Sequence, residues 1–214
     1  MAFRSNILSN SSKTPKPVAK YLLHAEDDVD DDESESKYIR VVENVIYFFA
    51  DVDTKTILTV TLALSKLIKE MQFVGIAYGI EPPPITIYIN SDGGEVHSAL
   101  SLYDFIRNST VEIITVITGN ACSAATIISL AGHKRKITEN SYMLIHNISS
   151  SFWGKMHEFE DEMKNMGMLT ENLNKIYKEN GKINKRTIES LLKKDLLLDA
   201  NTCLSYGFVD EIVA

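Results

Sequence analysis

The sequence predicts an α/β protein in which βαβ units form a mainly parallel sheet. Short runs rich in β-branched and aromatic residues, such as 45–49 and 85–89, alternate with segments whose apolar residues recur at helical spacing. Strands that alternate with helices are joined by crossovers, which place neighbouring strands parallel. Sites in such sheets form at the carboxyl ends of strands, so we expect chemistry after Ile89, Ile117 and Ile145.

The elements follow from the same patterns, in chain order. We expect strands at 45–49, 85–89, 111–117, 141–145 and 209–214, and helices from 54, after 94, and at 124–131, 157–179 and 185–193. Asp53 and Thr54 offer an N-cap to the first helix, and three prolines at 82–84 break the chain before the second strand. The basic run 133–136 is expected to be a solvated turn.

The domain organisation follows from a shift in composition. Residues 1–37 are expected to be a mobile extension, and the compact domain 38–214 to begin near Tyr38. The run 26–36 holds eight acids and no base, and without it the formal charge rises from −7 to +1. A body so close to neutral has little electrostatic attraction for nucleic acid, so we expect no nucleic-acid partner.

The chain offers no signal for a membrane, a metal or a cofactor. No run of about 18 apolar residues is present, and the N-terminus has no apolar signal-peptide core. Cys122 and Cys203 are expected to be reduced thiols, and the protein to be cytoplasmic. Neither zinc-ligand spacing nor a phosphate-binding loop occurs, so we expect no metal, no cofactor and no ATP hydrolysis by the chain itself.

A glycine turn follows the second predicted strand. Residues 90–94 read Asn-Ser-Asp-Gly-Gly, and a predicted helix comes next. Paired glycines let the backbone turn sharply and bring N–H groups close to a ligand. Those groups can bind negative charge, although a Gly-Gly pair is more often only a turn.

A candidate nucleophile, Ser123, follows the third predicted strand. Ser123 stands at the start of a predicted helix among small residues, where the N–H of Ala124 could donate to an oxyanion. The alternative is an ordinary serine N-cap. No Gly-x-Ser-x-Gly motif surrounds Ser123, which argues against an α/β-hydrolase elbow.

A candidate general base, His146, follows the strand that ends at Ile145. A serine nucleophile needs such a base, and the base needs an acid that orients it. Spacing alone leaves Asp195, Asp199 and Asp210 as possible acids. The histidines at 24, 97, 133 and 157 are expected to be structural or exposed.

Four segments together resemble the ClpP family, the proteolytic subunit of the Clp protease. Residues 87–94 resemble its Tyr-Ile-Asn-Ser-Pro-Gly-Gly segment, and residues 119–125, Gly-Asn-Ala-Cys-Ser-Ala-Ala, resemble its Gly-Gln-Ala-Ala-Ser-Met-Gly segment. Residues 143–147 resemble its Met-Ile-His-Gln-Pro segment. Asp195 resembles the catalytic aspartate of the family, and Tyr-Gly-Phe-Val-Asp at 206–210 resembles its Tyr-Gly-Leu-Val-Asp segment. The resemblance covers about 38–214 in the right order.

The resemblance implies a serine endopeptidase with a Ser123, His146 and Asp195 triad and an oxyanion hole made by Gly94 and Ala124. It implies a crotonase/ClpP-like α/β fold of βαβ units with a projecting helical handle at about 148–180. It also implies seven-membered rings that stack as a tetradecamer around a chamber, and a AAA+ Clp ATPase that feeds unfolded proteins or peptides into it.

Departures from the family leave other functions open. Asp92 replaces a proline of the family, and a carboxylate there would weaken the oxyanion hole unless it points to solvent. The alternatives are a catalytically impaired structural subunit, a crotonase-fold enzyme that acts on acyl-CoA thioesters, and a Ser-Lys signal-peptide peptidase. Cys122 is also a conceivable nucleophile.

Overall fold

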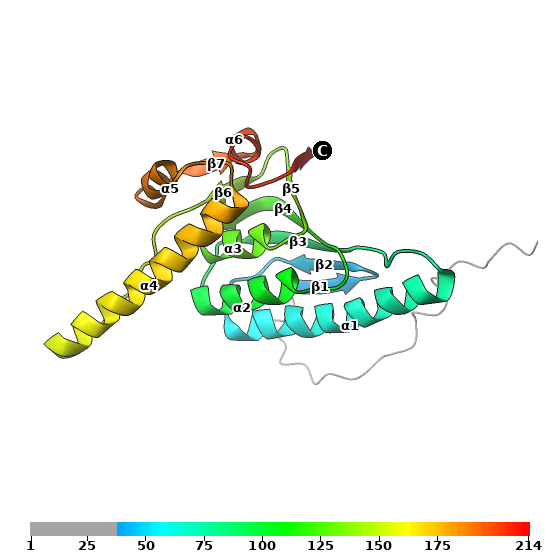
Figure 1. Cartoon of the computed structure of the whole chain (residues 1–214), viewed down its shortest axis with the longest axis horizontal. Coiled ribbons are helices and arrows are strands. Elements are labelled where there is room, and N and C mark those ends of the chain that lie inside the picture. Colours follow the sequence, from blue (N-terminus) through cyan, green and yellow to red (C-terminus); the bar gives the residue numbers. More distant parts are fainter. Residues whose placement is uncertain (1–37) are drawn as a thin grey trace, which may run out of the picture. The chain divides into compact units, whose positions relative to one another are not determined.

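A mixed, mainly parallel sheet forms the centre of the fold (Figure 1). The computed structural model describes residues 38–214, so the acidic extension expected at 1–37 lies outside the described residues. The sheet has eight strands within this part of the chain: β1 Ile39–Val42, β2 Val45–Phe48, β3 Ile85–Ser91, β4 Ile113–Cys122, β5 Lys134–Thr138, β6 Tyr142–Leu144, β7 Leu197–Asp199 and β8 Glu211–Val213.

The strand order of the sheet agrees with the βαβ units predicted from the sequence. The main path runs β1-β2-β3-β4-β5-β8, and every neighbouring pair on it is parallel except β1 with β2. Beyond this path β6 pairs parallel with the last residues of β4, and β7 pairs antiparallel with β6. The mixed α/β fold predicted from the sequence is therefore confirmed.

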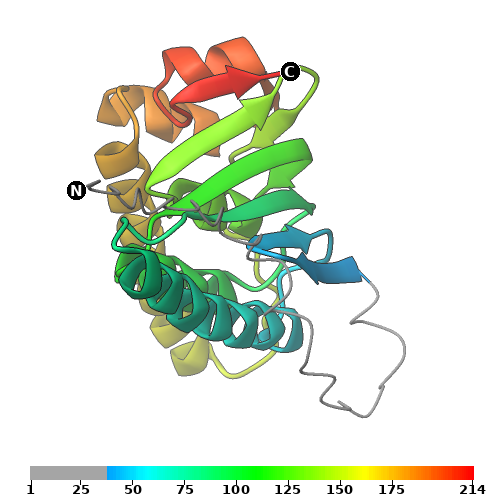
Figure 2. The same cartoon turned by 90° about the vertical axis from the view of Figure 1, so that its right-hand side faces the viewer.

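Six helices connect these strands within residues 38–214: α1 Thr54–Tyr78, α2 Val96–Arg107, α3 Ala124–Leu130, α4 Met156–Asn180, α5 Lys185–Leu192 and α6 Ala200–Ser205. α1, α2 and α3 lie side by side on one face of the sheet (Figure 2). Strand β3 turns Ile85, Ile87 and Ile89 into the core between the sheet and these helices. As predicted, Asp53 caps α1, where its carboxylate accepts a bond from the N–H of Thr56.

The sequence prediction was wrong for the basic run 133–136. Lys134–Thr138 forms strand β5, which is paired on one side with β4 and on the other with β8. Ile137 is buried, and the basic side chains are neutralised by ion pairs with Glu112, Asp210 and Glu211. Periodicity cannot reveal this strand, because its charge is compensated by residues far away in the chain.

The third predicted strand is longer than expected and runs to Cys122, so that Ser123 follows the strand directly. Strands β1 and β7 and helix α6 were not expected. They are three to six residues long, too short for their apolar pattern to be distinguished from a loop.

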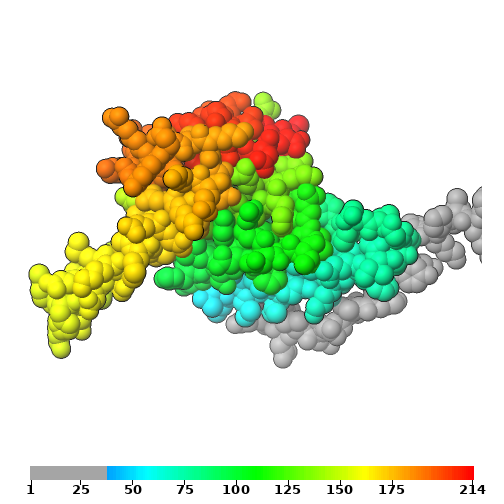
Figure 3. Space-filling view, viewed as in Figure 1, coloured from blue at the N-terminus to red at the C-terminus, as the bar shows by residue number. Residues whose placement is uncertain are grey.

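Helix α4 has two different halves. Its C-terminal half packs against the body through the buried residues Leu173, Ile176 and Tyr177. Its N-terminal half extends beyond the sheet (Figures 1 and 3). Met156, Phe159, Met163 and Met168 are exposed there, and we call these four residues the exposed α4 stripe. Among the described helices, none is both long enough and apolar enough to cross a bilayer.

Candidate active site

Ser123 occupies a strained position at the end of the longest strand. It has φ 54° and ψ −123°, and α3 begins at the next residue, Ala124. A positive φ is costly for a residue with a side chain, about 1–3 kcal/mol, and such strain concentrates at functional sites. The N–H of Ser123 donates to the carbonyl of Leu144 at 2.8 Å, which ties this turn to strand β6.

His146 lies beside this turn because β6 is parallel to β4. The ladder pairs Cys122 with Leu144, so the chain reaches His146 two residues beyond the last pair. The imidazole is half-buried, and its Nδ1 lies 3.0 Å from Oδ1 of Asp195. With Nδ1 engaged by a carboxylate, the other ring nitrogen, Nε2, is the one left to accept a proton.

Asp195 reaches His146 through the antiparallel pairing of β6 with β7. Leu144 is opposite Leu197, and two further steps along each strand bring His146 opposite Asp195. The other two acids that spacing left open have different partners. Asp199 caps α6 by accepting from the N–H of Thr202 at 2.7 Å, and Asp210 binds Arg135.

Ser123 and His146 follow two paired strands, but their side chains are not hydrogen-bonded to each other. Within residues 38–214, Ser123 Oγ makes no hydrogen bond to the His146 ring. Catalytic hydrogen bonds are often long in unliganded proteins and shorten when substrate binds. The structure thus joins His146 with Asp195 by a hydrogen bond but shows none between Ser123 and His146.

The glycine turn after β3 packs directly against Ser123. A side chain at Gly93 would bring a Cβ atom to 2.8 Å from Ser123 Cβ and 2.6 Å from the carbonyl oxygen of Cys122. At Gly94, with φ 143°, a Cβ would overlap the carbonyl oxygen of Val52. Both positions therefore require glycine. The sequence predicted a sharp turn from the pair, and the resemblance implied an oxyanion-hole role for Gly94 alone. The signal for Gly93 was the doubled glycine itself.

Two backbone N–H groups near Ser123 are left without a partner. The N–H of Gly93 donates to Ser91 Oγ at 3.2 Å. By contrast, those of Gly94 and Ala124 donate to no acceptor in the described part of the chain. Unpaired donors beside a nucleophile are the chemistry of an oxyanion hole. These are the two donors expected from the resemblance.

Asp92, the departure from the family pattern, is turned outwards. Its carboxylate is exposed and accepts a hydrogen bond from Asn120 Nδ2 at 2.6 Å. The same amide nitrogen lies 3.3 Å from Cys122 Sγ. Burial raises the pKa of the Cys122 thiol despite this bond. A protonated thiol is a poor nucleophile, which argues against Cys122.

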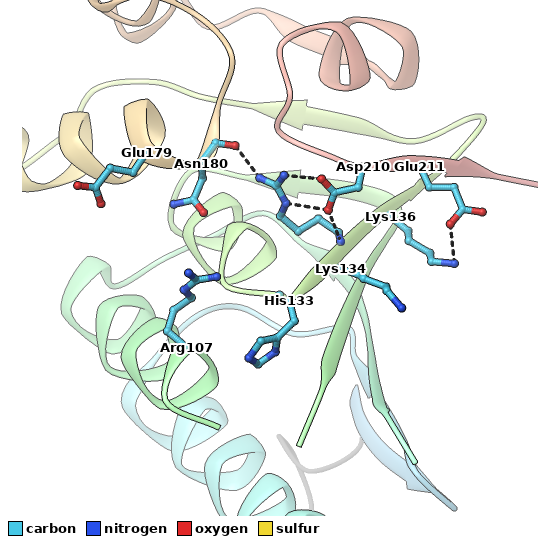
Figure 4. A pocket seen from close by; sticks show the side chains of 10 residues that line it. Arg107, His133, Lys134, Lys136, Glu179, Asn180, Asp210 and Glu211 are labelled. Atoms are coloured by element: carbon cyan, nitrogen blue, oxygen red, sulfur yellow. Dashed lines mark hydrogen bonds and ion pairs between the residues drawn. The ribbon is translucent and has the colours of Figure 1, made fainter. Parts of the chain in front are cut away.

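A separate hollow of about 420 Å³ lies at the start of β5 (Figure 4). It contains Arg135, whose guanidinium binds both carboxylate oxygens of Asp210 and the carbonyl of Asn180. Lys136 pairs with Glu211 at 2.7 Å. The bonds of Arg135 and Lys136 hold β5, β8 with the residue before it, and the end of α4 together, so we regard the hollow as structural. Neither here nor elsewhere in residues 38–214 do three or more His, Cys, Asp or Glu side chains gather as a metal site would need.

Comparison with known proteins identifies the family. The Clp protease family model matches residues 52–214. The ATP-dependent Clp protease proteolytic subunit of Deinococcus radiodurans is 29% identical over 131 residues, which are 60% of this chain and 64% of that protein. The alignment thus spans a little less than two thirds of that relative. The family match covers most of the chain, including the glycine turn, Ser123, His146 and Asp195, and we conclude that this chain belongs to the Clp protease family.

Proposed function

We propose that this member of the Clp protease family is a serine endopeptidase with Ser123, His146 and Asp195 as its catalytic triad. Ser123 Oγ attacks the peptide carbonyl carbon while Nε2 of His146 takes the hydroxyl proton. The C–N bond then breaks, and His146 gives this proton to the leaving amine. Water, activated by the same imidazole, hydrolyses the acyl-enzyme and restores Ser123.

Asp195 and two backbone N–H groups support this chemistry. The carboxylate of Asp195 holds the proton on Nδ1 and stabilises the imidazolium that forms at His146. The N–H groups of Gly94 and Ala124 stabilise the negative oxygen of the tetrahedral intermediate. The carboxylate of Asp92 is exposed, so water screens its charge.

The single observation that carries the proposal is the His146–Asp195 contact beside the strained turn at Ser123. Three segments distant in the chain supply a hydroxyl, an imidazole and a carboxylate at one edge of the sheet. A purely structural role of these residues would require neither a positive φ at a serine nor a histidine bound through Nδ1 to a carboxylate that is 81% exposed.

The test is hydrolysis of fluorogenic peptides by the full chain, with Ser123→Ala beside it. We expect the variant to lose about 10⁴-fold or more in kcat/KM. Ser190→Ala, at an exposed position on α5, is the matched control and keeps full activity. A fluorophosphonate should label the wild-type chain at Ser123 only. Full activity in Ser123→Ala would disprove the assignment.

We further propose that the chain works in a closed oligomer, a ring of seven that stacks as a tetradecamer, and is fed by a AAA+ ATPase. The exposed α4 stripe leaves large apolar side chains in water, which favours burial against another copy. The name of the Deinococcus relative includes ATP dependence, and this sequence has no phosphate-binding loop of its own. Native mass measurement tests the assembly: Met163→Glu should dissociate it, and Ser190→Glu should not.

One observation favours a second candidate function, that of a structural subunit without peptidase activity. Ser123 Oγ lacks a hydrogen bond to His146 within the described residues. A subunit of this kind would assemble normally and remain unlabelled by a fluorophosphonate. The labelling experiment therefore separates the two functions directly.

A further inference from the structure

Helix α4 contacts the segment that follows Ser123 through one buried hydrogen bond. The phenol oxygen of Tyr177 lies 2.7 Å from Oγ1 of Thr126, on α3. Both side chains are almost completely buried, with exposed fractions of 2% for Tyr177 and 0% for Thr126. From the sequence, Tyr177 was expected only to lie in the helix at 157–179 and Thr126 only in the helix at 124–131.

Thr126 in turn binds the backbone of Ser123. Its hydroxyl donates to the carbonyl oxygen of Ser123 at 2.6 Å, and its N–H donates to the same oxygen at 3.0 Å. A threonine hydroxyl has one proton, so its bond with Tyr177 must be one in which the phenol donates. Burial raises the pKa of Tyr177 to about 12, which keeps that proton in place at neutral pH.

The carbonyl held by Thr126 belongs to the same peptide unit as the N–H of Ala124. A peptide unit is planar, so a hydrogen bond that fixes the direction of the C=O also fixes the direction of the N–H. Hydrogen bonds accepted by the carbonyl also polarise the unit and strengthen its N–H as a donor, by about 10–30% per bond. These bonds also help to hold the strained backbone at Ser123, where φ is 54°.

We infer that Tyr177 and Thr126 are positioning residues for the oxyanion hole. They form a chain of hydrogen bonds that runs from the Tyr177 hydroxyl through the Thr126 hydroxyl to the Ser123 carbonyl, and so orients and polarises the N–H of Ala124. This inference rests on the proposed peptidase function. It assigns to two buried side chains, neither of which touches substrate, a share in transition-state stabilisation.

The first experiment measures kcat and KM of the assembled full chain for a fluorogenic peptide. Loss of an oxyanion donor typically lowers kcat by about 10²–10³-fold, and misorientation of one costs less, so we expect Tyr177→Phe to lower kcat by about 5- to 10-fold at unchanged KM. Tyr103→Phe is the matched control: its hydroxyl accepts from Asn180 Nδ2 at 3.0 Å and has no link to Ser123. It should keep the wild-type kcat.

A peptide boronate supplies the readout that a merely structural role would not change. The boronate forms a tetrahedral adduct with the serine and places an oxygen in the oxyanion hole. For Tyr177→Phe, its inhibition constant should rise by the same factor by which kcat falls. Equal weakening of substrate and boronate binding would instead indicate a general loss of packing and overturn the inference.

Thr126 variants keep the inference testable if Tyr177→Phe does not fold. Thr126→Ser retains the hydroxyl and should keep kcat within about threefold, whereas the isosteric Thr126→Val should lower it by about 10-fold or more. The double variant Tyr177→Phe/Thr126→Val should be no slower than Thr126→Val alone, because the chain is already cut there. Additive losses would contradict a serial chain.

The outcomes also separate this inference from the proposed function. A wild-type chain that cleaves no peptide and takes no fluorophosphonate at Ser123 overturns both. If the wild type does both, and Tyr177→Phe and Thr126→Val match its kcat within twofold, the positioning role alone is wrong.

Discussion

The His146–Asp195 pair and the Arg135–Asp210 pair each join a carboxylate to a nitrogen base, in regions that differ in exposure. Within residues 38–214 the carboxylate of Asp195 makes one hydrogen bond, at 3.0 Å, and its side chain is 81% exposed. Asp210 receives three bonds from Arg135, through the backbone N–H, Nε and a terminal guanidinium nitrogen, and Arg135 is only 15% exposed. Exposed single contacts stabilise a fold little, whereas bidentate and partly buried ones stabilise it more. Asp210 therefore stabilises the fold, whereas Asp195 stabilises it little and is free for the role proposed above.

The largest expected effect is that of Asp195→Asn on the rate of peptide hydrolysis. Without the carboxylate, His146 is no longer held in the tautomer that accepts the serine proton, and we expect kcat/KM to fall by about 10³–10⁴-fold. The thermal midpoint should stay within error of wild type, because the lost contact is exposed. Peptide hydrolysis and thermal unfolding measure the two quantities. A large loss of stability with unchanged activity would reverse the assignment.

Asp210→Asn should show the opposite behaviour. It leaves Arg135 largely buried without its carboxylate, and we expect a loss of about 1–2 kcal/mol in the free energy of unfolding, a value reduced because Asp210 is 47% exposed. Activity should stay within twofold of wild type at temperatures where the variant is folded. Unfolding midpoints must be compared at one protein concentration. A loss of activity greater than the loss of folded protein would show that Asp210 does more than stabilise the fold.

The pH dependence of this stabilisation follows from the pKa of Asp210. Burial raises that pKa, but the hydrogen bonds and positive charge of Arg135 outweigh burial and hold it below its ordinary value of 3.8. A lowered folded-state pKa contributes stability that is present above the unfolded pKa and lost as the pH falls through the folded one. The difference in thermal midpoint between wild type and Asp210→Asn should therefore be constant from neutral pH down to about 4.5 and shrink below about 3.8. A difference that disappears near neutral pH would contradict this cause.

The smallest effect is expected for Glu211→Gln, in the same ion-pair region. Glu211 pairs with Lys136 through a single contact at 2.7 Å, and its side chain is 55% exposed. A pair of this kind contributes less than about 0.5 kcal/mol, and salt screens it. Thermal unfolding at low and high ionic strength measures it. An effect as large as that of Asp210→Asn would show that the whole cluster acts as one unit.

Much of the fold could be predicted from periodicity. The strand at 85–89 and the first helix have apolar residues at the spacing that buries one face, and in that helix Ile57, Val60, Leu64 and Leu67 are buried while Ile68 is partly buried. Strand β5 could not be predicted in this way. Its sequence, Lys-Arg-Lys-Ile-Thr, has one buried apolar residue, and its charges are acceptable only because acids from β8 and from the residue before it, Asp210, lie next to it.

The candidate site, like the fold, could be predicted from the sequence only in part. Ser123 and His146 could be located because each follows an apolar strand in a predicted parallel sheet. The positive φ of Ser123 and the contact between Gly93 and Ser123 have no sequence signal beyond the small residues around them. The Tyr177–Thr126 bond joins residues 51 positions apart in the chain, and no local pattern identifies such a pair.

From the sequence alone came the order of the apolar strands and the longer helices, a hydroxyl and an imidazole that each follow one of those strands, and several acids near the end of the sequence, because local periodicity and residue type carry that information. Spacing in the sequence left three acids open and only the resemblance favoured Asp195, so the tertiary structure was needed to show which acid faces His146. Asp195, Asp199 and Asp210 are alike as residues, and only the antiparallel register of β6 with β7 brings the first of them within 3.0 Å of the ring. Register is a property of two paired segments, here 49 residues apart, and neither segment contains it alone.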